Sequence, residues 1–514
     1  MKKKWMKLLC AVLTCCLLVS ALAGCGSSSS GSSESGDDSA STDEIVEITF
    51  LYPTMGSTPD DLEEVEAAIN EISEAEIGVS VTLLPVSVAD MQSEVTRMAA
   101  SGESLDLLIC LGTGQTFVNS GLLMSLDDLL EEYGEGVEEA LGTVLTGGQY
   151  AGATYYIPAN SRYATESGMF FRQDILDKYG LSLEEGETLT YEILDEWFAI
   201  IKEGEGDNFY MFSNVGSSAT LAQGFCYPDT LGGQLYTGVL TDYEDDGNYT
   251  VENFYESEAF LEFAEWMHKW YEAGYINPDS ATMTDSQVEL MMTGNYLGSF
   301  GDTSVGMDAE YTTSYGYDMV SYTMYESTVV MSNYSSPSLA ISSTSENPEA
   351  AMKFINLMYT NEEIVNLFQN GIEGVHYVLT DEEGIITYPD GVDATTTGYA
   401  SQGAMYGNQN LKYWWSPSTS EDRDELIEFN EEIASGEGDY RISKAFGYAF
   451  NTDEVSTEVA AISDVIAEYL GVIEFGTQDP DEAIPALNAA LEAAGLSTVI
   501  EANQAQLDEW VAAQ

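Results

Sequence analysis

The chain has few basic residues and almost no histidine. Its 514 residues include 15 Lys and Arg, 88 Asp and Glu, and two His, which gives a formal net charge of -73. Nucleic-acid partners are excluded, because affinity for phosphates comes from Lys and Arg side chains. The same charge disfavours polyanionic substrates and anionic membrane surfaces, although a local basic cluster can override it. Since 44% of residues are hydrophobic, we nevertheless expect most of the chain to fold.

Cysteine is also scarce. Three of the six cysteines precede residue 20, a fourth is Cys25, and only Cys110 and Cys226 remain in the rest of the chain. These two can form one disulfide or stay as free thiols, and the sequence does not decide between the two. Both have apolar neighbours, which favours two buried free thiols.

The first 24 residues have the features of an export signal. Lys2, Lys3, Lys4 and Lys7 precede an apolar run of about sixteen residues, short for a membrane span. The run ends in Leu-Ala-Gly-Cys at residues 22–25, which resembles the lipobox of bacterial lipoproteins. That resemblance implies a signal peptide at 1–24, a diacylglycerol on Cys25 and a protein anchored to the outer face of a Gram-positive cell membrane. Residues 25–43 are rich in Ser and Gly and are expected to form a flexible tether.

The body of the chain alternates between strand and helix patterns. Residues 44–52, 78–84 and 105–110 have the patterns of strands, and the two intervening segments carry apolar residues at helical spacing. This order predicts a parallel sheet with helices on both faces. Ligands of such sheets bind beyond the carboxyl ends of the strands, which here are followed by Tyr52, Thr113 and Gln115.

Motifs of the common enzyme classes are missing. Gly112-Thr113-Gly114 begins like a dinucleotide-binding loop, but Phe117 stands where the third glycine is needed. Neither a G-x-S-x-G nor an H-E-x-x-H motif is present. We therefore expect a protein without catalytic residues, bound metal or cofactor. A surface glycoside hydrolase stays open as an alternative, because 88 acidic residues supply carboxylate pairs by chance.

Four longer segments follow one another in the body of the chain: MFFRQDILDKYG at 169–180, FLEFAEWMHKWYEAGYINPD at 260–279, SPSLAISSTSENPEAAMKFINLMYTNEEIVNLF at 336–368 and AGLSTVIEANQAQLDEW at 494–510. In this order they resemble the family 1 extracellular solute-binding proteins, which deliver solutes, mostly sugars, to ABC importers. The last segment further resembles a lipoprotein branch with a C-terminal domain of unassigned function.

The resemblance implies an α/β protein of the periplasmic-binding-protein type II fold, with two doubly wound lobes joined by a hinge. It divides the chain into an N-terminal lobe of 44–165 plus 329–375 and a C-terminal lobe of 166–328 plus 376–514. The implied protein is a monomer that captures a carbohydrate between the lobes and delivers it to permease subunits, with the lipid anchor as its sole membrane contact. A peptide ligand for the same fold stays open as an alternative.

Candidate ligand-binding residues come from three arguments. The strand ends select Tyr52, Thr113 and Gln115. Tyr163, Glu166, Phe300 and Asp302 are candidates because they lie in the second lobe or near the point where the chain is expected to cross from the first lobe to the second. Trp414 and Trp415 stand in the polar segment GNQNLKYWWSPS, which has no apolar periodicity, so they either stack on a sugar in the cleft or pack in the core. Maltose binders of this family carry a Trp at the stretch corresponding to 299–304, which here reads SFGDTS.

Overall fold

The structure is a computed structural model. It describes residues 45–54, 58–150, 152–184, 186–216, 221–241, 247–329, 336–393, 396–399, 406–435 and 441–513. The expected signal peptide, the lipidated Cys25 and the tether lie outside the described residues. Residues 45–514 belong to one compact unit, built around two five-stranded sheets.

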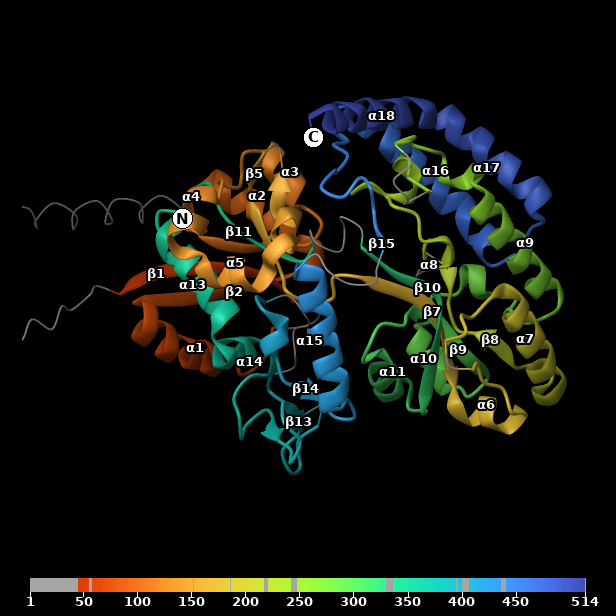
Figure 1. Ribbon diagram of the computed structural model, residues 1–514, viewed down its shortest axis with the longest axis horizontal. Coiled ribbons are helices and arrows are strands. Elements are labelled where there is room, and N and C mark those ends of the chain that lie inside the picture. Colours follow the sequence, from red (N-terminus) through yellow and green to blue (C-terminus); the bar gives the residue numbers. More distant parts are fainter. Residues whose placement is uncertain are drawn as a thin grey trace, which may run out of the picture. The chain divides into compact units, whose positions relative to one another are not determined.

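The first sheet has the strand order β2-β1-β3-β11-β6, and Figure 1 labels β1, β2 and β11 of this sheet. Strands β1, β2 and β3 are parallel, which confirms the β-α-β-α-β arrangement predicted from the alternating patterns, and β11 runs antiparallel to β3 and β6. The bounds of these strands are β1 Val46–Thr54, β2 Val79–Ser87, β3 Leu107–Cys110, β6 Tyr156–Pro158 and β11 Ser338–Ile341.

Eight helices accompany this sheet in the described part of the chain. Residues of all eight pack in or against its core, which is rich in Phe, Leu and Ile from both sheet and helices. These helices are α1 Leu62–Ile77, α2 Met91–Ser101, α3 Gly114–Asn119, α4 Asp127–Tyr133, α5 Glu135–Leu141, α13 Pro348–Thr360, α14 Glu362–Asn370 and α15 Ser420–Ser435.

The second sheet has the strand order β15-β10-β7-β9-β8 and is mixed. Strand β7 runs antiparallel to both β9 and β10, whereas β8 is parallel to β9 and β15 is parallel to β10. The bounds are β7 Thr165–Arg172, β8 Tyr210–Phe212, β9 Tyr296–Asp302, β10 Met319–Val329 and β15 Arg441–Ile442. Two small sheets complete the strands: β12 Val378–Leu379, β13 Ile385–Thr387 and β14 Trp414–Trp415 in one, and β4 Gln149–Tyr150 with β5 Ala153–Thr154 in the other.

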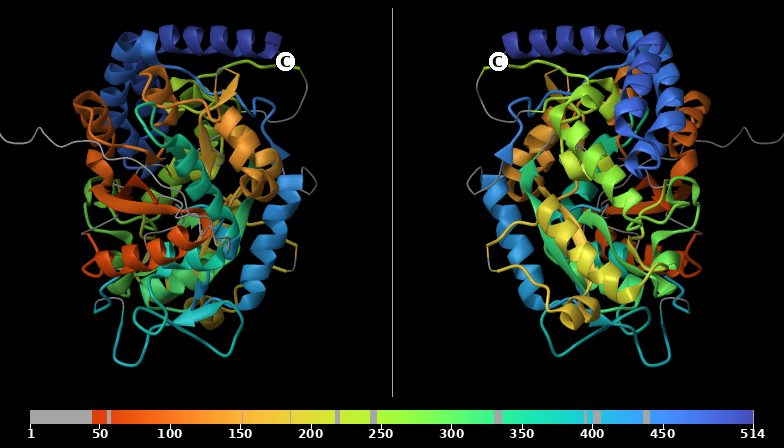
Figure 2. Two further views of the ribbon diagram at one scale, coloured as in Figure 1. Left: turned by 90° about the vertical axis from the view of Figure 1, so that its left-hand side faces the viewer. Right: turned by 90° about the vertical axis from the view of Figure 1, so that its right-hand side faces the viewer.

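The helices of the second lobe include the three that end the chain. Leu487 and Leu491 of α17 share one core with Phe263 of α9, so the C-terminal helices are built into this lobe, with α16 and α17 against α9 (Figure 2). The helices are α6 Gln173–Tyr179, α7 Tyr191–Glu205, α8 Leu221–Cys226, α9 Glu258–Glu272, α10 Gln287–Met292, α11 Met307–Tyr315, α16 Ser456–Glu474, α17 Pro480–Ala494 and α18 Leu496–Ala513.

Judged from the described residues, the chain passes between the two cores three times. Tyr399 and Ile433 pack in the first core and Ala445 packs in the second, so the third passage lies between residues 433 and 445. The resemblance implies that 376–514 belongs wholly to the second lobe, whereas Tyr399 and Ile433 of this range pack in the first core. The difference arises because α15 and the small sheet of β12 to β14 form a subdomain on the first lobe.

The two cysteines outside the N-terminal region are separate. Cys110 is buried in the first core and Cys226 packs against the second, and both are free thiols. Among the described helices no single one is long and apolar enough to cross a membrane, and α17 with α18 passes such a test only as a pair bent by 71°.

Candidate ligand-binding site

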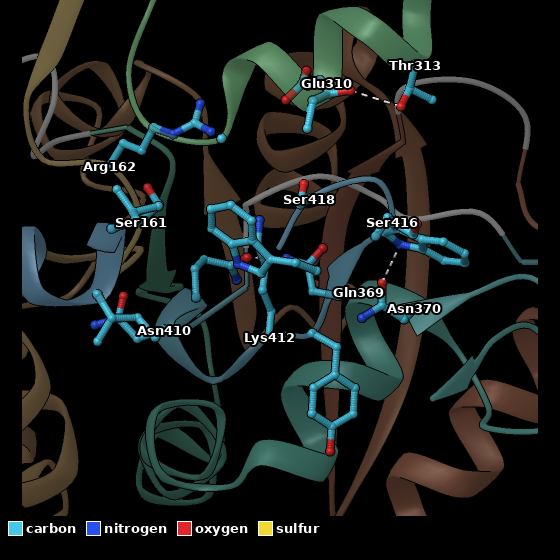
Figure 3. A pocket seen from close by; sticks show the side chains of 18 of the residues that line it. Ser161, Arg162, Glu310, Thr313, Gln369, Asn370, Asn410, Lys412, Ser416 and Ser418 are labelled. Atoms are coloured by element: carbon cyan, nitrogen blue, oxygen red, sulfur yellow. Dashed lines mark hydrogen bonds between the residues drawn. The ribbon is translucent and has the colours of Figure 1, made fainter. Parts of the chain in front are cut away.

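A cavity of about 670 Å³ lies between α11 of the second lobe and the subdomain that α15 and β14 form with the end of α14. In Figure 3, Glu310 and Thr313 of α11 lie along one side, and Gln369, Asn370 and Lys412 lie on the other. The lining residues are Ser161, Arg162, Gly306, Ala309, Glu310, Thr313, Ser314, Pro337, Gln369, Asn370, Gln409, Asn410, Lys412, Tyr413, Trp414, Trp415, Ser416, Pro417, Ser418, Leu426, Ile427 and Asn430.

Two tryptophans form the aromatic part of the wall. Strand β14 pairs with β13, which fixes the backbone of both residues. Trp414 is 8% exposed and packs with Ile385 and Leu426. The Nε1 atom of Trp415 donates a hydrogen bond of 2.9 Å to Oδ1 of Asn370, and its ring centroid lies 4.3 Å from that of Tyr388. Both indoles are therefore held in place at the cavity.

Gly306 brings the second lobe against this wall. Its φ is 83°, and a Cβ at this position would lie 2.5 Å from Cζ3 of Trp414. Ordinary carbon contacts are about 3.5–4.0 Å, so a glycine is required both by the backbone conformation and by the close approach. The contact joins the N-terminus of α11 to β14 of the other lobe.

Amide side chains supply most of the polar wall. Gln369 donates from Nε2 to Oε1 of Gln409 at 2.5 Å, and Asn430 donates from Nδ2 to Oδ1 of Asn410 at 3.2 Å. The Oδ1 atom of Asn430 is buried and has no hydrogen-bond partner among the described residues. Because amides both donate and accept, this wall matches hydroxyl groups, which do the same.

Three charged side chains line the cavity. Arg162 donates to Sδ of Met307 and to the carbonyl of Val305, at 2.6 and 3.3 Å. The ammonium of Lys412 lies 5.5 Å from the ring centroid of Trp414, and burial together with the nearby Arg162 lowers its pKa to about 8. Glu310 is the single acidic residue of the lining.

The structure brings two of the nine candidate residues to this cavity, Trp414 and Trp415. Tyr52 is 1% exposed, and its ring lies 6.0 Å from that of Tyr406 in the first core. Tyr163 is fully buried and donates to Oδ1 of Asn160 at 2.5 Å. Phe300 packs in the second core. Tyr52, Tyr163 and Phe300 are thus core side chains in the described arrangement, and a binding role for them stays a prediction.

The other four candidates lie at the junction of the lobes or beside it. Gln115 donates from Nε2 to the carbonyl of Ala449 at 3.0 Å and so links α3 to the second lobe. Thr113 precedes α3. Glu166 accepts a hydrogen bond of 3.2 Å from Thr323 within the second sheet.

Asp302 connects indirectly to the cavity. Its Oδ1 accepts from the backbone N of Ser304 at 3.0 Å, and its Oδ2 lies 3.7 Å from the guanidinium of Arg162. Sequence reasoning thus selected a neighbour of the cavity in Asp302 but missed Arg162 itself.

The amides and Lys412 were also missed. Gln409, Asn410 and Lys412 belong to the same polar segment as the two tryptophans, GNQNLKYWWSPS. The lack of apolar periodicity that made Trp414 and Trp415 candidates therefore applies to these polar neighbours as well. Within the described ranges, no group of three or more His, Cys, Asp or Glu side chains is arranged to hold a metal ion.

Comparisons with known proteins cover nearly the whole body of the chain. A carbohydrate ABC transporter substrate-binding protein of Streptococcus pneumoniae serotype 4 is 27% identical over 475 residues, which is 89% of this chain and 90% of the relative. The crystal structure of the N-glycan transport solute binding protein (NgtS) from S. pneumoniae matches with a TM-score of 0.77 and 25% identity, covering 90% of this chain and 98% of that one. Its complex with Man1GlcNAc matches with a TM-score of 0.69 at 25% identity, covering 90% and 99%.

Two families account for most of the sequence. Residues 444–512 match a domain of unknown function (DUF3502), which confirms the expected C-terminal domain of unassigned function. Residues 56–364 match the bacterial extracellular solute-binding proteins. The resemblance and the type II α/β fold expected from the sequence are both confirmed. The chain belongs to the bacterial extracellular solute-binding protein family.

Proposed function

We propose that the protein binds an oligosaccharide in the cavity between α11 and the subdomain of α15 and β14, and that it delivers this ligand to an ABC transporter. The relatives named above are carbohydrate or N-glycan binding proteins of such transporters, which supports this assignment. A cavity of about 670 Å³ is within the usual range of about 300–1,000 Å³ for small-molecule sites.

The observation that carries the proposal is the composition of the wall. Two tryptophans offer apolar faces for the C–H groups of sugar rings, and five amide side chains offer donors and acceptors for hydroxyls. Amide groups can both donate and accept, so they complement hydroxyl groups, whereas an apolar ligand would cover them without forming any new hydrogen bond. The site therefore favours a polyhydroxylated ligand over an apolar one.

Both lobes contribute to the wall, which suits capture by closure. Gly306 and Glu310 come from the second lobe, while Asn370, Trp415 and Asn430 come from the subdomain on the first. A ligand that contacts both sides binds the closed state more tightly than the open one, and this differential affinity drives closure. The closed, loaded protein is then what the permease subunits receive.

We further propose that Cys25 carries a lipid that holds the monomeric protein on the outer face of the cell membrane. The basic start, the apolar run and the sequence Leu-Ala-Gly-Cys at 22–25 support this proposal. Metabolic labelling with a fatty-acid analogue should mark the wild-type protein. A Cys25→Ala variant should lose the label and leave the membrane fraction, and retention of both would contradict the anchor.

A thermal-shift screen of oligosaccharides, single sugars and peptides tests the proposed function. We expect an oligosaccharide to raise the midpoint of unfolding, since ligand at about 100 times Kd stabilises the folded state by about 2.7 kcal/mol. Chromatography of the recovered ligand should find it unchanged. Stabilisation by peptides alone would overturn the carbohydrate proposal, and cleaved ligand would indicate a glycoside hydrolase.

A further inference from the structure

The cavity reverses the charge balance of the chain. Of the 15 basic residues four stand in the first seven positions, so eleven basic residues remain against 88 acidic ones. Two of those eleven, Arg162 and Lys412, line the cavity, whereas Glu310 is the single acidic residue there. The local environment thus differs in sign from the average surface, and such a local cluster determines which ligand charge is favoured at short range.

The ammonium of Lys412 has no strong partner. Among the described residues no carboxylate lies within 4.0 Å of it and no hydrogen bond joins it to another group; its neighbour is the Trp414 ring at 5.5 Å. An ammonium group has three donors, and a partly buried charge without a partner is unfavourable. The low pKa of this amine has the same origin, burial and repulsion by Arg162.

Arg162 is only loosely neutralised. Its carboxylate partner, Asp302, lies 3.7 Å away, which is longer than a hydrogen bond, and Oδ1 of Asp302 is engaged by Ser304. Among the described residues, two acceptors lie within hydrogen-bond distance of Arg162, the sulfur of Met307 and the carbonyl oxygen of Val305, although a guanidinium offers five N–H donors. Arg162 therefore keeps donors for a further acceptor at the cavity wall.

We infer that the oligosaccharide bound in this cavity carries an acidic group, a carboxylate of a sialic or uronic acid residue, held by Lys412 and Arg162. The inference rests on the proposed function and specifies its ligand. A carboxylate offers two oxygens for the two cations, and charge-assisted hydrogen bonds of this kind are about twice as strong as neutral ones. With a neutral sugar, Arg162 would keep only the carboxylate of Asp302 at 3.7 Å, and Lys412 would gain no carboxylate within 4.0 Å.

A glycan library with matched members tests this inference on the full chain. Each sialylated or uronic oligosaccharide is paired with its neutral counterpart, a sulfated form is added where one exists, and affinity is measured by calorimetry. We expect the carboxylated member of a bound pair to bind at least about tenfold more tightly than the neutral one. In Lys412→Met this preference should fall to about threefold or less, and in Glu310→Gln it should increase, because a competing negative charge is removed.

Several outcomes separate the inference from the proposed function. Lys353→Met serves as the control, since Lys353 lies over the Tyr133 ring outside the cavity lining, and it should keep the wild-type preference. If neutral members bind as tightly as acidic ones and Lys412→Met changes nothing, the acidic-ligand inference is overturned while the proposed function stands. A preference for sulfated over carboxylated members also overturns it. If no member of the library binds, both fail.

Discussion

Replacing Gly306 with alanine tests whether the contact between the lobes belongs to the ligand-bound state. The added Cβ would lie 2.5 Å from Cζ3 and 3.0 Å from Cη2 of Trp414, well inside ordinary contact distance. Overpacking of this kind costs about 1–3 kcal/mol. In addition, a non-glycine residue at φ 83° is strained by about 1–2 kcal/mol, and this strain is present whether the lobes are apart or together.

The backbone strain and the clash with Trp414 are expected to change two different quantities, the free energy of unfolding and the affinity for the ligand. The backbone strain should lower the free energy of unfolding of Gly306→Ala, while the clash should weaken binding by roughly 5- to 150-fold, the equivalent of the overpacking cost. Gly316 provides a matched control. It ends the same helix with φ 73°, and a Cβ there would have no atom within 4 Å. Gly316→Ala should therefore reproduce the loss of stability without the loss of affinity.

Calorimetric titration with an oligosaccharide from the thermal-shift screen, together with thermal unfolding of the free protein, measures both effects. A second substitution, Trp414→Phe in the Gly306→Ala background, reduces the ring that the new Cβ meets and should recover part of the affinity. If Gly306→Ala binds as tightly as Gly316→Ala, the approach of Gly306 to Trp414 is not part of the bound state, and the reasoning from this contact is refuted.

Three further substitutions follow from the structure. Replacing both Trp414 and Trp415 with alanine should abolish saccharide binding in calorimetry, and unaltered affinity would remove the tryptophans from the site. Gln115→Leu removes the hydrogen bond to Ala449 and should weaken binding by about 2- to 10-fold, since such a bond contributes about 0.5–1.5 kcal/mol; a tighter complex would contradict this. Burial raises the pKa of Glu474 from 4.5 to about 7, so the folded state holds this proton more tightly and stability falls as the pH rises through that window. Glu474→Gln should remove up to about 3 kcal/mol of this pH dependence in denaturant titrations, and an unchanged slope would exclude Glu474 as its source.

The fold could be predicted because its signals are local. The first parallel strands alternate with helices whose apolar faces are visible in the sequence, and β1 and β2 lie where the patterns place them. Helix α7 begins after Thr190, a residue type that favours helix starts, and the Oγ1 atom of Thr190 accepts a hydrogen bond from the backbone N of Ile193. These features need no knowledge of distant segments.

The site depended on distant segments and was predicted only in part. Tyr52 ends a strand, where ligands often bind, but Tyr406 covers its ring from more than 300 residues away along the chain. No periodicity in the strand reveals that cover. Trp414 and Trp415 were recognised because their segment lacks apolar periodicity, and the same property belongs to Lys412 beside them. The lack of apolar periodicity therefore identified GNQNLKYWWSPS as a segment that lines the cavity. It did not show which lobe this segment packs on.

The C-terminal domain connects the stability of the second lobe to the junction between the lobes. Its helix α17 buries Leu487 in the core shared with α9, and truncating a leucine in such a core costs about 2–5 kcal/mol. The domain therefore cannot be removed without opening that core. At its other end, Ala449 accepts the hydrogen bond from Gln115 of the first lobe. Since one end is fixed in the second core and the other touches α3, a movement that separates the lobes at this point would break the hydrogen bond between Gln115 and Ala449.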